Sequence, residues 1–189
     1  MFKWLTSFTY GIEDKAAEID TIYRLACKYY ENVVSKEAIL ANVTKDDHIL
    51  CIGGGICPFS AILFHQRTGA KVTVIDNNES CIPRARSVIE RLGLDEYVHV
   101  CHQDGACCDI SLSDYSVVHI ALQVDPIDSV FSSIESQIAP GTKLLVRRPK
   151  KVLSATSSKL QERLMSCCAY VNHNTRNIGA TFLYVKQPA

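Results

Sequence analysis

Residues 48–61 read HILCIGGGICPFSA, and this stretch decides the fold. The apolar run 49–52 predicts a buried strand, the three glycines predict a tight turn, and Pro58 followed by residues 59–66 predicts a helix. Glycines between a strand and a helix let backbone N–H groups approach a ligand, because no Cβ is in the way. The stretch therefore predicts a strand, a glycine turn and a helix, with room for a nucleotide-like ligand.

The glycine spacing departs from the dinucleotide-binding pattern G-x-G-x-x-G. Gly53 and Gly55 occupy the first two glycine positions, and Pro58 stands at the third. The third glycine of that pattern permits close packing of the helix, whereas proline is well tolerated in a first helical turn. The loop can therefore form, but the nicotinamide interpretation is weakened. A turn that binds no ligand is the alternative for any bare glycine triplet.

Acidic residues end the next two predicted strands. Residues 71–75 alternate with β-branched side chains before Asp76, and residues 98–101 form a short strand that leads to Asp104 and Gly105. An acid about 20 residues past the glycines can accept hydrogen bonds from ribose hydroxyls. The alternative for Asp76 is to cap the next helix, a common position for aspartate.

Strands and helices alternate along the rest of the chain, which predicts an α/β fold with a mostly parallel seven-stranded, Rossmann-like sheet and helices on both faces. The predicted helices cover residues 13–41, 77–92, 127–138 and 158–168, and the further strands cover 116–122, 143–146, 169–172 and 181–186. Gly93 is placed to cap the second of these helices, and the last two strands predict an antiparallel hairpin. We expect a short helical segment at 1–45 and one compact domain at 46–189.

The composition argues against several classes of partner. Lys plus Arg number 20 and Asp plus Glu number 20, and the short basic run at 147–151 is interrupted by Pro149. Nucleic acid and an anionic membrane are therefore not expected as partners. The sequence shows no signal peptide and no apolar run that could span a bilayer, so a cytoplasmic location is expected. The nine cysteines are odd in number and lack Cys-x-x-Cys spacing, so we expect reduced thiols and no structural metal.

In chain order, the strand, the glycine turn, the two acid-ended strands and an Arg-containing helix that ends in LGL resemble the class I S-adenosylmethionine-dependent transferases. The resemblance covers residues 46–146 and implies the class I methyltransferase fold with S-adenosylmethionine as cofactor. In such folds an acid after the third strand often contacts the adenine amino group, and for Asp104 the alternative is solvation of a loop. The usual acid two positions before the first glycine is Cys51 here, and the commoner G-x-G-x-G is replaced by GGGICP.

These departures point to one branch, because the loop IGGGICPFSAILF is similar to that of archaeal nicotianamine synthases and related metallophore synthases. As in that family, the fifth strand runs into Arg147, and residues 174–188 form an Asn-containing turn and a strand that ends near Lys-x-Pro. Tyr30 precedes the glycine loop at the spacing of the family's substrate-site tyrosine, so the resemblance extends over residues 29–188. It implies transfer of a 3-amino-3-carboxypropyl group to an amine of a small amino-acid-like substrate, with release of methylthioadenosine.

The resemblance also implies roles at the transfer site. Tyr30 would orient the nucleophile or relay its proton, and Arg147 would clamp a substrate carboxylate through its planar fork. The alternatives are core packing for Tyr30 and a surface ion pair for Arg147. Family members use an acid in an N-terminal helical domain as base; Glu13, Glu18 and Glu31 are available here, but no motif matches them to that acid.

Three functions stay open at this point: aminocarboxypropyl transfer, methyl transfer to a small molecule, and a nucleotide-binding module without catalysis. The N-terminal helix could serve a homodimer interface, and core packing explains it equally well. We interpret the histidines as strand-end or surface residues without a role: His48, His65, His99, His102, His119 and His173. The predicted cofactor-binding residues are Gly53, Gly54, Gly55, Pro58, Asp76, Asn77, Asp104 and Gly105.

Overall fold

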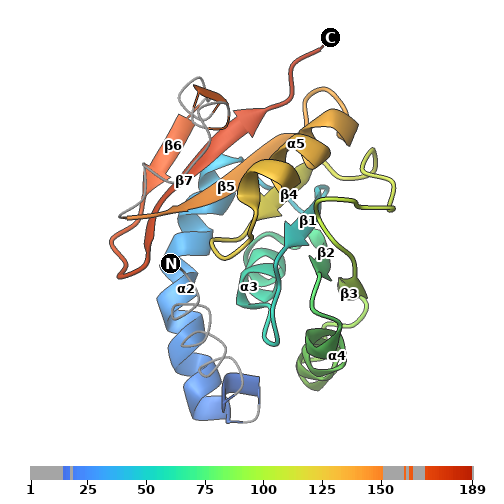
Figure 1. Ribbon diagram of the computed structural model, residues 1–189. Coiled ribbons are helices and arrows are strands. Elements are labelled where there is room, and N and C mark those ends of the chain that lie inside the picture. Colours follow the sequence, from blue (N-terminus) through green and yellow to red (C-terminus); the bar gives the residue numbers. More distant parts are fainter. Residues whose placement is uncertain (1–14, 18, 151–159, 161, 164–168, 189) are drawn as a thin grey trace.

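A computed structural model describes residues 15–17, 19–150, 160, 162, 163 and 169–188 of the 189-residue chain. Its centre is a seven-stranded sheet in the order β3-β2-β1-β4-β5-β7-β6 (Figure 1). The strands are β1 (His48–Ile52), β2 (Lys71–Asp76), β3 (Val98–His102), β4 (Val117–Ile120), β5 (Lys143–Pro149), β6 (Ala169–Asn172) and β7 (Ile178–Val185). β1 to β5 pair in parallel, and β7 runs antiparallel to both β5 and β6. The prediction of a mostly parallel sheet with an antiparallel hairpin is confirmed.

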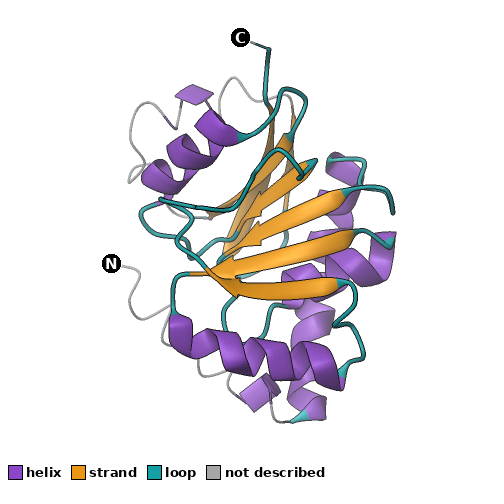
Figure 2. Ribbon diagram, turned by 90° about the vertical axis from the view of Figure 1, so that its right-hand side faces the viewer, coloured by secondary structure: helices purple, strands orange, loops and turns teal. Residues whose placement is uncertain are grey.

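Helices cover both faces of the sheet, as predicted (Figure 2). They are α2 (Asp20–Leu40), α3 (Phe59–Thr68), the 3-10 turn η1 (Glu79–Cys81), α4 (Ile82–Arg91) and α5 (Ile127–Gln137). One hydrophobic cluster joins α2, α3 and α4 to one face, and a second cluster joins α5 to the other. The N-terminal helix α2 thus shares a core with the sheet domain. In the described part of the chain, no helix has the length and apolar character needed to cross a membrane.

The helix predicted over residues 77–92 is divided into η1 and α4. The side chain of Asn78 accepts a hydrogen bond from the Ser80 backbone N–H and caps η1, and Pro83 lies in the first turn of α4, where a missing N–H costs little. Gly93 ends α4 with φ +64°, and the Leu94 N–H donates to the Ile89 carbonyl, which confirms the predicted glycine cap. Of the helix predicted over 158–168, residues 160, 162 and 163 are helical and the others lie outside the described residues.

Strands β5 and β7 both extend beyond the residues that the sequence predicted for them, β5 at its end and β7 at its start. β5 continues past residue 146 to Pro149, because β7 pairs with it as far back as Ile178. Backbone pairing, rather than side-chain hydrophobicity, sets the length of these strands. The extension places Arg147 and Thr181 opposite each other in the ladder.

The alternation of side chains along the strands decides which residues meet under α2 and α3. Cys51 on β1 and Leu145 on β5 belong to the cluster on that face, and His119 on β4 is paired in register with both. Because side chains two positions apart share a face, Arg147 follows Leu145 onto the α2 side, and Thr181 precedes Leu183 on the same side. Four adjacent strands therefore contribute Cys51, His119, Arg147 and Thr181 to the face that α2 and α3 cover.

Candidate functional site

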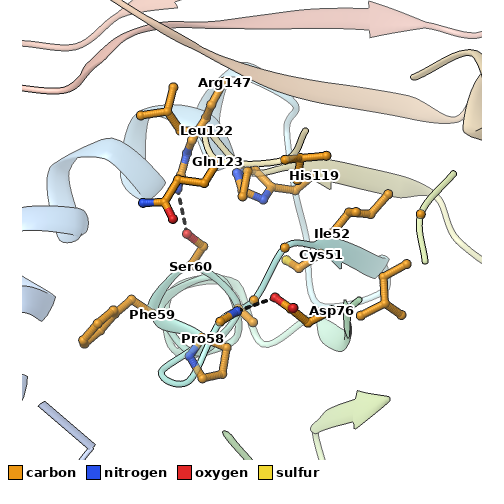
Figure 3. Close-up of a pocket in the computed structure, with 18 of the residues that line it drawn as sticks. Cys51, Ile52, Pro58, Phe59, Ser60, Asp76, His119, Leu122, Gln123 and Arg147 are labelled. Carbon is orange, nitrogen blue, oxygen red and sulfur yellow. Dashed lines mark hydrogen bonds between the residues drawn. The ribbon is translucent and has the colours of Figure 1, made fainter. Parts of the chain in front are cut away.

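A pocket opens at the carboxyl ends of the central parallel strands. It lies between the glycine turn and the middle of α2, where Tyr29 and Tyr30 line it. Ligands bind at this edge of open α/β sheets as a general rule. The structure brings all ten sequence-predicted site residues to this one pocket: Tyr30, Gly53, Gly54, Gly55, Pro58, Asp76, Asn77, Asp104, Gly105 and Arg147. Figure 3 shows Pro58 and Asp76 at one end and Arg147 and His119 at the other.

The glycine turn lies tightly against β2. Gly53 and Gly55 have φ values of +84° and +64°, a conformation that favours glycine. The Gly53 N–H donates to the Ile75 carbonyl at 2.9 Å, which ties the turn to the end of β2. Gly54 is required by packing, because a Cβ there would lie 2.2 Å from Cγ1 of Val74. All three glycines therefore have a physical reason to be glycine.

Asp76 is fixed by two backbone donors. Its Oδ2 accepts from the Gly55 N–H at 2.7 Å, and its Oδ1 accepts from the Asn78 N–H at 2.9 Å. Since Asn78 caps η1, the helix-cap alternative for Asp76 is wrong. A carboxylate has lone pairs beyond these two bonds, so Asp76 is an oriented acceptor on the pocket wall.

Asp104 and Gly105 form the pocket wall after β3. Asp104 is exposed, and its Oδ1 accepts a hydrogen bond from the Ala106 N–H of the same loop at 2.9 Å. The Asp104 side chain also lines the pocket. Gly105 is buried, and a Cβ there would lie 2.8 Å from Cγ2 of Ile52. The loop consequently passes close to the end of β1 and narrows the pocket on this side.

At the other end, Arg147 forms a buried ion pair with Glu37 from α2. Nε donates to Oε1 and Nη2 donates to Oε2, both at 2.7 Å, and Nη1 donates to the Ser60 hydroxyl at 2.8 Å (Figure 3). Arg147 is only 3% exposed. The alternative of a surface ion pair for Arg147 is therefore wrong, because its partner is internal and its guanidinium is enclosed.

Glu37, on the same helix as Tyr30, is a residue to which the sequence reasoning assigned no role. Its side chain is fully buried, and the Thr181 hydroxyl donates to Oε1 at 2.6 Å. Burial by itself raises the pKa of Glu37, but the charge of Arg147 and the hydrogen bonds from Arg147 and Thr181 lower it to about 2. Glu37 is thus an ionised structural partner and a poor proton acceptor. Its signal in the sequence is an acid on the buried stripe of α2, which includes Ala26, Val33 and Val34.

Two of the six histidines are buried, in contrast to the strand-end or surface positions expected for most of them. His119 and His173 are 1% and 4% exposed. Nε2 of His173 hydrogen-bonds with the Thr181 hydroxyl at 2.8 Å. Neither ring nitrogen of His119 has a hydrogen-bond partner among the described residues, and His119 lines the pocket. Burial and the charge of Arg147 lower the pKa of His119 to about 3, so its imidazole is neutral.

Tyr30 both packs and lines the pocket. Its ring stacks on Phe59 with centroids 5.5 Å apart and an interplanar angle of 14°, and Cζ of Arg147 lies 5.8 Å from its centroid. Tyr30 therefore does pack in the core, as one alternative had it, and it also contributes to the pocket wall. Of the acids considered as bases, Glu31 is exposed and pairs with Arg67 at 2.8 Å. Glu13 and Glu18 lie outside the described residues.

The described cysteines are free thiols, among them Cys51 and Cys57 at the pocket. Burial raises the pKa of Cys51 to about 12, so its thiol is protonated and inert as a nucleophile. Within the residues that the structure describes, no group of His, Cys, Asp and Glu is arranged to hold a metal ion.

Comparison with solved structures shows the fold. A Glu-to-Gln mutant of MtNAS, a nicotianamine synthase, in complex with S-adenosylmethionine is 22% identical over 98% of this chain and 76% of that chain, with a TM-score of 0.84. MtNAS in complex with MTA and tNA is 22% identical over 94% and 69%, with a TM-score of 0.79. An RNA methyltransferase from Salinibacter ruber in complex with S-adenosyl-L-homocysteine is 17% identical over 84% and 92%, with a TM-score of 0.67. No family model and no curated protein sequence matches the chain. The architecture is thus the class I Rossmann-like methyltransferase fold.

Proposed function

We propose that this protein is an S-adenosylmethionine-dependent transferase that moves the 3-amino-3-carboxypropyl group to an amine of a small amino-acid-like substrate. One observation carries the proposal: a single pocket is lined by the glycine turn and Asp76 at one end and by Tyr30 and Arg147 at the other. The likeness to MtNAS, solved with S-adenosylmethionine and with MTA and tNA, supports it over nearly the whole chain. On this proposal the cofactor and the acceptor bind in the same pocket, the cofactor towards the glycine turn and the acceptor towards Arg147.

The glycine-turn end fits the adenosine half of this cofactor. Asp76 is held by the Gly55 and Asn78 N–H groups with acceptor capacity left for two ribose hydroxyls. Asp104 stands next to buried Gly105 where an adenine ring would lie against the end of β3. When bound, the cofactor supplies carbon atoms that its sulfonium group already activates. The protein's task is then to position the acceptor amine and remove its proton.

The opposite end fits the transfer step. Stacking on Phe59 and the nearby Arg147 guanidinium fix the Tyr30 ring at the pocket wall, where its hydroxyl can orient an amine or relay its proton. Arg147 has more N–H donors than its contacts with Glu37 and Ser60 use, so it can still donate to a substrate carboxylate. Glu37 would position Arg147 rather than contact substrate.

Methyl transfer is the second candidate, because the same fold occurs in the methyltransferase from Salinibacter ruber. The two reactions leave different nucleosides. We would incubate the purified protein with S-adenosylmethionine, amino acids and cell extract, and identify the nucleoside product by mass spectrometry. Methylthioadenosine above a control without protein is the expected result. S-adenosylhomocysteine would assign methyl transfer instead, and binding of S-adenosylmethionine with neither product would indicate a binding module.

Tyr30→Phe separates catalysis from binding. We expect methylthioadenosine production to fall about 100-fold or more, as when a proton-transfer group is removed, while the dissociation constant for S-adenosylmethionine stays within about twofold of the parent value. Tyr170→Phe is the matched control, because Tyr170 is exposed on β6 and outside the pocket. Full turnover by Tyr30→Phe would remove Tyr30 from the mechanism.

Asp76→Asn tests the ribose assignment. Loss of the charge weakens hydrogen bonds of a charged acceptor, so the affinity for S-adenosylmethionine should fall about tenfold or more. Glu79→Gln removes a nearby exposed acid at the start of η1 and should leave this affinity unchanged. Equal affinities of both variants, measured by calorimetry, would refute the ribose contact.

A further inference from the structure

His119 is a buried polar side chain whose ring nitrogens make no hydrogen bond within the described part of the chain. It is 1% exposed, it lines the pocket, and neither Nδ1 nor Nε2 has a hydrogen-bond partner among the described residues. Buried polar side-chain atoms in folded proteins nearly always have such partners, because an unpaired group loses its hydration without compensation. A histidine in this state at a pocket wall points to a missing partner, and the pocket is where that partner can enter.

The surroundings of His119 decide the chemistry of that partner. The nearest acid, Glu37, has an oxygen 3.8 Å from Nε2, but Arg147 and Thr181 already engage its carboxylate, and it does not line the pocket. The cation next to His119 is Arg147, which lines the pocket and has N–H groups beyond those that Glu37 engages. Such a site favours an anionic oxygen over an ammonium group.

The neighbouring polar groups at the pocket wall are donors. The Ser60 hydroxyl accepts from Arg147 and can donate its own hydrogen, and Arg147 has N–H groups beyond those in its ion pair. A neutral imidazole carries one N–H, which completes a set of donors from β4, β5 and α3. Figure 3 shows His119, Arg147 and Ser60 around the same part of the pocket.

We propose that His119 is a ligand-binding residue whose ring N–H donates a hydrogen bond to a carboxylate, beside Arg147. The inference deepens the proposed function and rests on it. The carboxylate has two sources in that reaction: the methionyl arm of S-adenosylmethionine, and the amino-acid-like acceptor. The two carboxylates present the same anionic oxygens. The experiments distinguish them by using, in turn, a cofactor without its carboxylate and an acceptor without its carboxylate.

The first experiment compares S-adenosylmethionine with its decarboxylated form by calorimetry, using the parent protein, His119→Leu and His119→Gln. If His119 holds the methionyl carboxylate, His119→Leu weakens S-adenosylmethionine about tenfold or more and leaves the decarboxylated compound unchanged. His119→Gln, which retains an N–H donor, restores part of the affinity. His65→Leu is the matched control, since His65 is half-buried, stacks on Tyr97 and lies outside the pocket.

The second experiment addresses the acceptor. Methylthioadenosine release is measured with a pool of amino acids and with the corresponding pool of amino acid amides, whose carboxylates are neutralised. If His119 holds the acceptor's carboxylate, the parent protein prefers the acids and His119→Leu loses that preference, while binding of S-adenosylmethionine is unaltered. This outcome, like the first, supports the proposal and identifies the source.

Two results overturn the inference alone. His119→Leu could weaken S-adenosylmethionine and its decarboxylated form equally, which is the signature of a packing role, or it could change neither the binding ratio nor the acid preference. A different result overturns the proposed function itself: a parent protein that binds neither S-adenosylmethionine nor methylthioadenosine. The failure of each claim is therefore distinguishable from the other.

Discussion

The two ends of the pocket are built in different ways. The glycine-turn end is made of backbone and short-range contacts, such as the bond from the Gly55 N–H to Asp76, 21 positions away. The opposite end is made of side chains from five elements, and its longest bond in sequence joins Thr181 to Glu37 across 144 positions. The first end is a local motif that many chains can carry. The second exists only after α2, α3, β4, β5 and β7 have come together, so it tells more about this particular chain.

Glu37→Gln should have the largest effect, and on stability rather than cofactor binding. It leaves the buried Arg147 guanidinium without its counter-charge, which costs about 3–5 kcal/mol in the free energy of unfolding. Glu31→Gln, which breaks the exposed pair with Arg67, should cost less than about 1 kcal/mol. Denaturant titration of both variants measures the difference, and equal losses would contradict the contrast between the two ends.

The double variant Glu37→Leu/Arg147→Met sharpens the same comparison. Replacing both charges by apolar groups of similar volume is often neutral for stability, so the double variant should be more stable than Glu37→Gln. We expect it to bind methylthioadenosine, which has no carboxylate, through the unaltered glycine-turn end and to lose transfer. Loss of binding together with transfer would show that the ends are not separable.

Gly54→Ala tests the local end and should have a smaller effect on stability. Its Cβ would lie 2.2 Å from Cγ1 of Val74, so the turn must move, at a cost of about 1–3 kcal/mol, and S-adenosylmethionine should bind more weakly. Gly93→Ala is the control, because nothing lies within 4 Å of a Cβ there and only its φ of +64° is strained, at about 1 kcal/mol. Parent-like binding by Gly54→Ala would mean that the turn does not shape the cofactor site.

The smallest predicted effect is on the pH dependence of stability. The pKa of His119 is lowered from its usual 6.5 to about 3, so the unfolded chain takes up a proton that the folded protein refuses. Stability from this group is complete above pH 6.5 and is lost as the pH falls towards 3. The lowered pKa of Glu37, about 2, adds a further loss between pH 4.5 and 2. In His119→Leu, the fall in melting temperature between pH 6.5 and 4.5 should be smaller than in the parent protein by a few degrees. Superimposable profiles of melting temperature against pH for the two proteins would contradict this.

The fold was predicted well from the sequence, and so were the positions of the glycine turn and of the strand ends that line the pocket. Gly53, Asp76, Asp104 and the hairpin after β5 lie where their patterns indicated, because each pattern spans a single strand and its adjacent turn. The division of residues 77–92 was missed, because the Asn78 side chain binds the backbone locally and competes with a regular helix.

The other end could be predicted only in part. Arg147 was identified at the end of its strand, but its partner could not be, since nothing local links it to a glutamate 110 positions earlier. His119 lies among Val117, Val118 and Ile120, all fully buried. A lone histidine in such a strand is itself a signal, because a central parallel strand is covered on both faces. The pattern does not say which way the ring faces, and that depends on the register with β1 and β5.

The buried pair of Glu37 and Arg147 also has a consequence for synthesis. Glu37 leaves the ribosome long before Arg147, and Thr181 emerges later still. Until they arrive, docking α2 on the nascent sheet would enclose a bare carboxylate, which is strongly unfavourable. We therefore expect α2 to dock on the sheet only after β5 and β7 have been made, whereas the glycine turn and the first strands can form earlier. Closure of this end of the pocket therefore has to follow the synthesis of β7, so a shorter nascent chain would carry the glycine turn without the buried network.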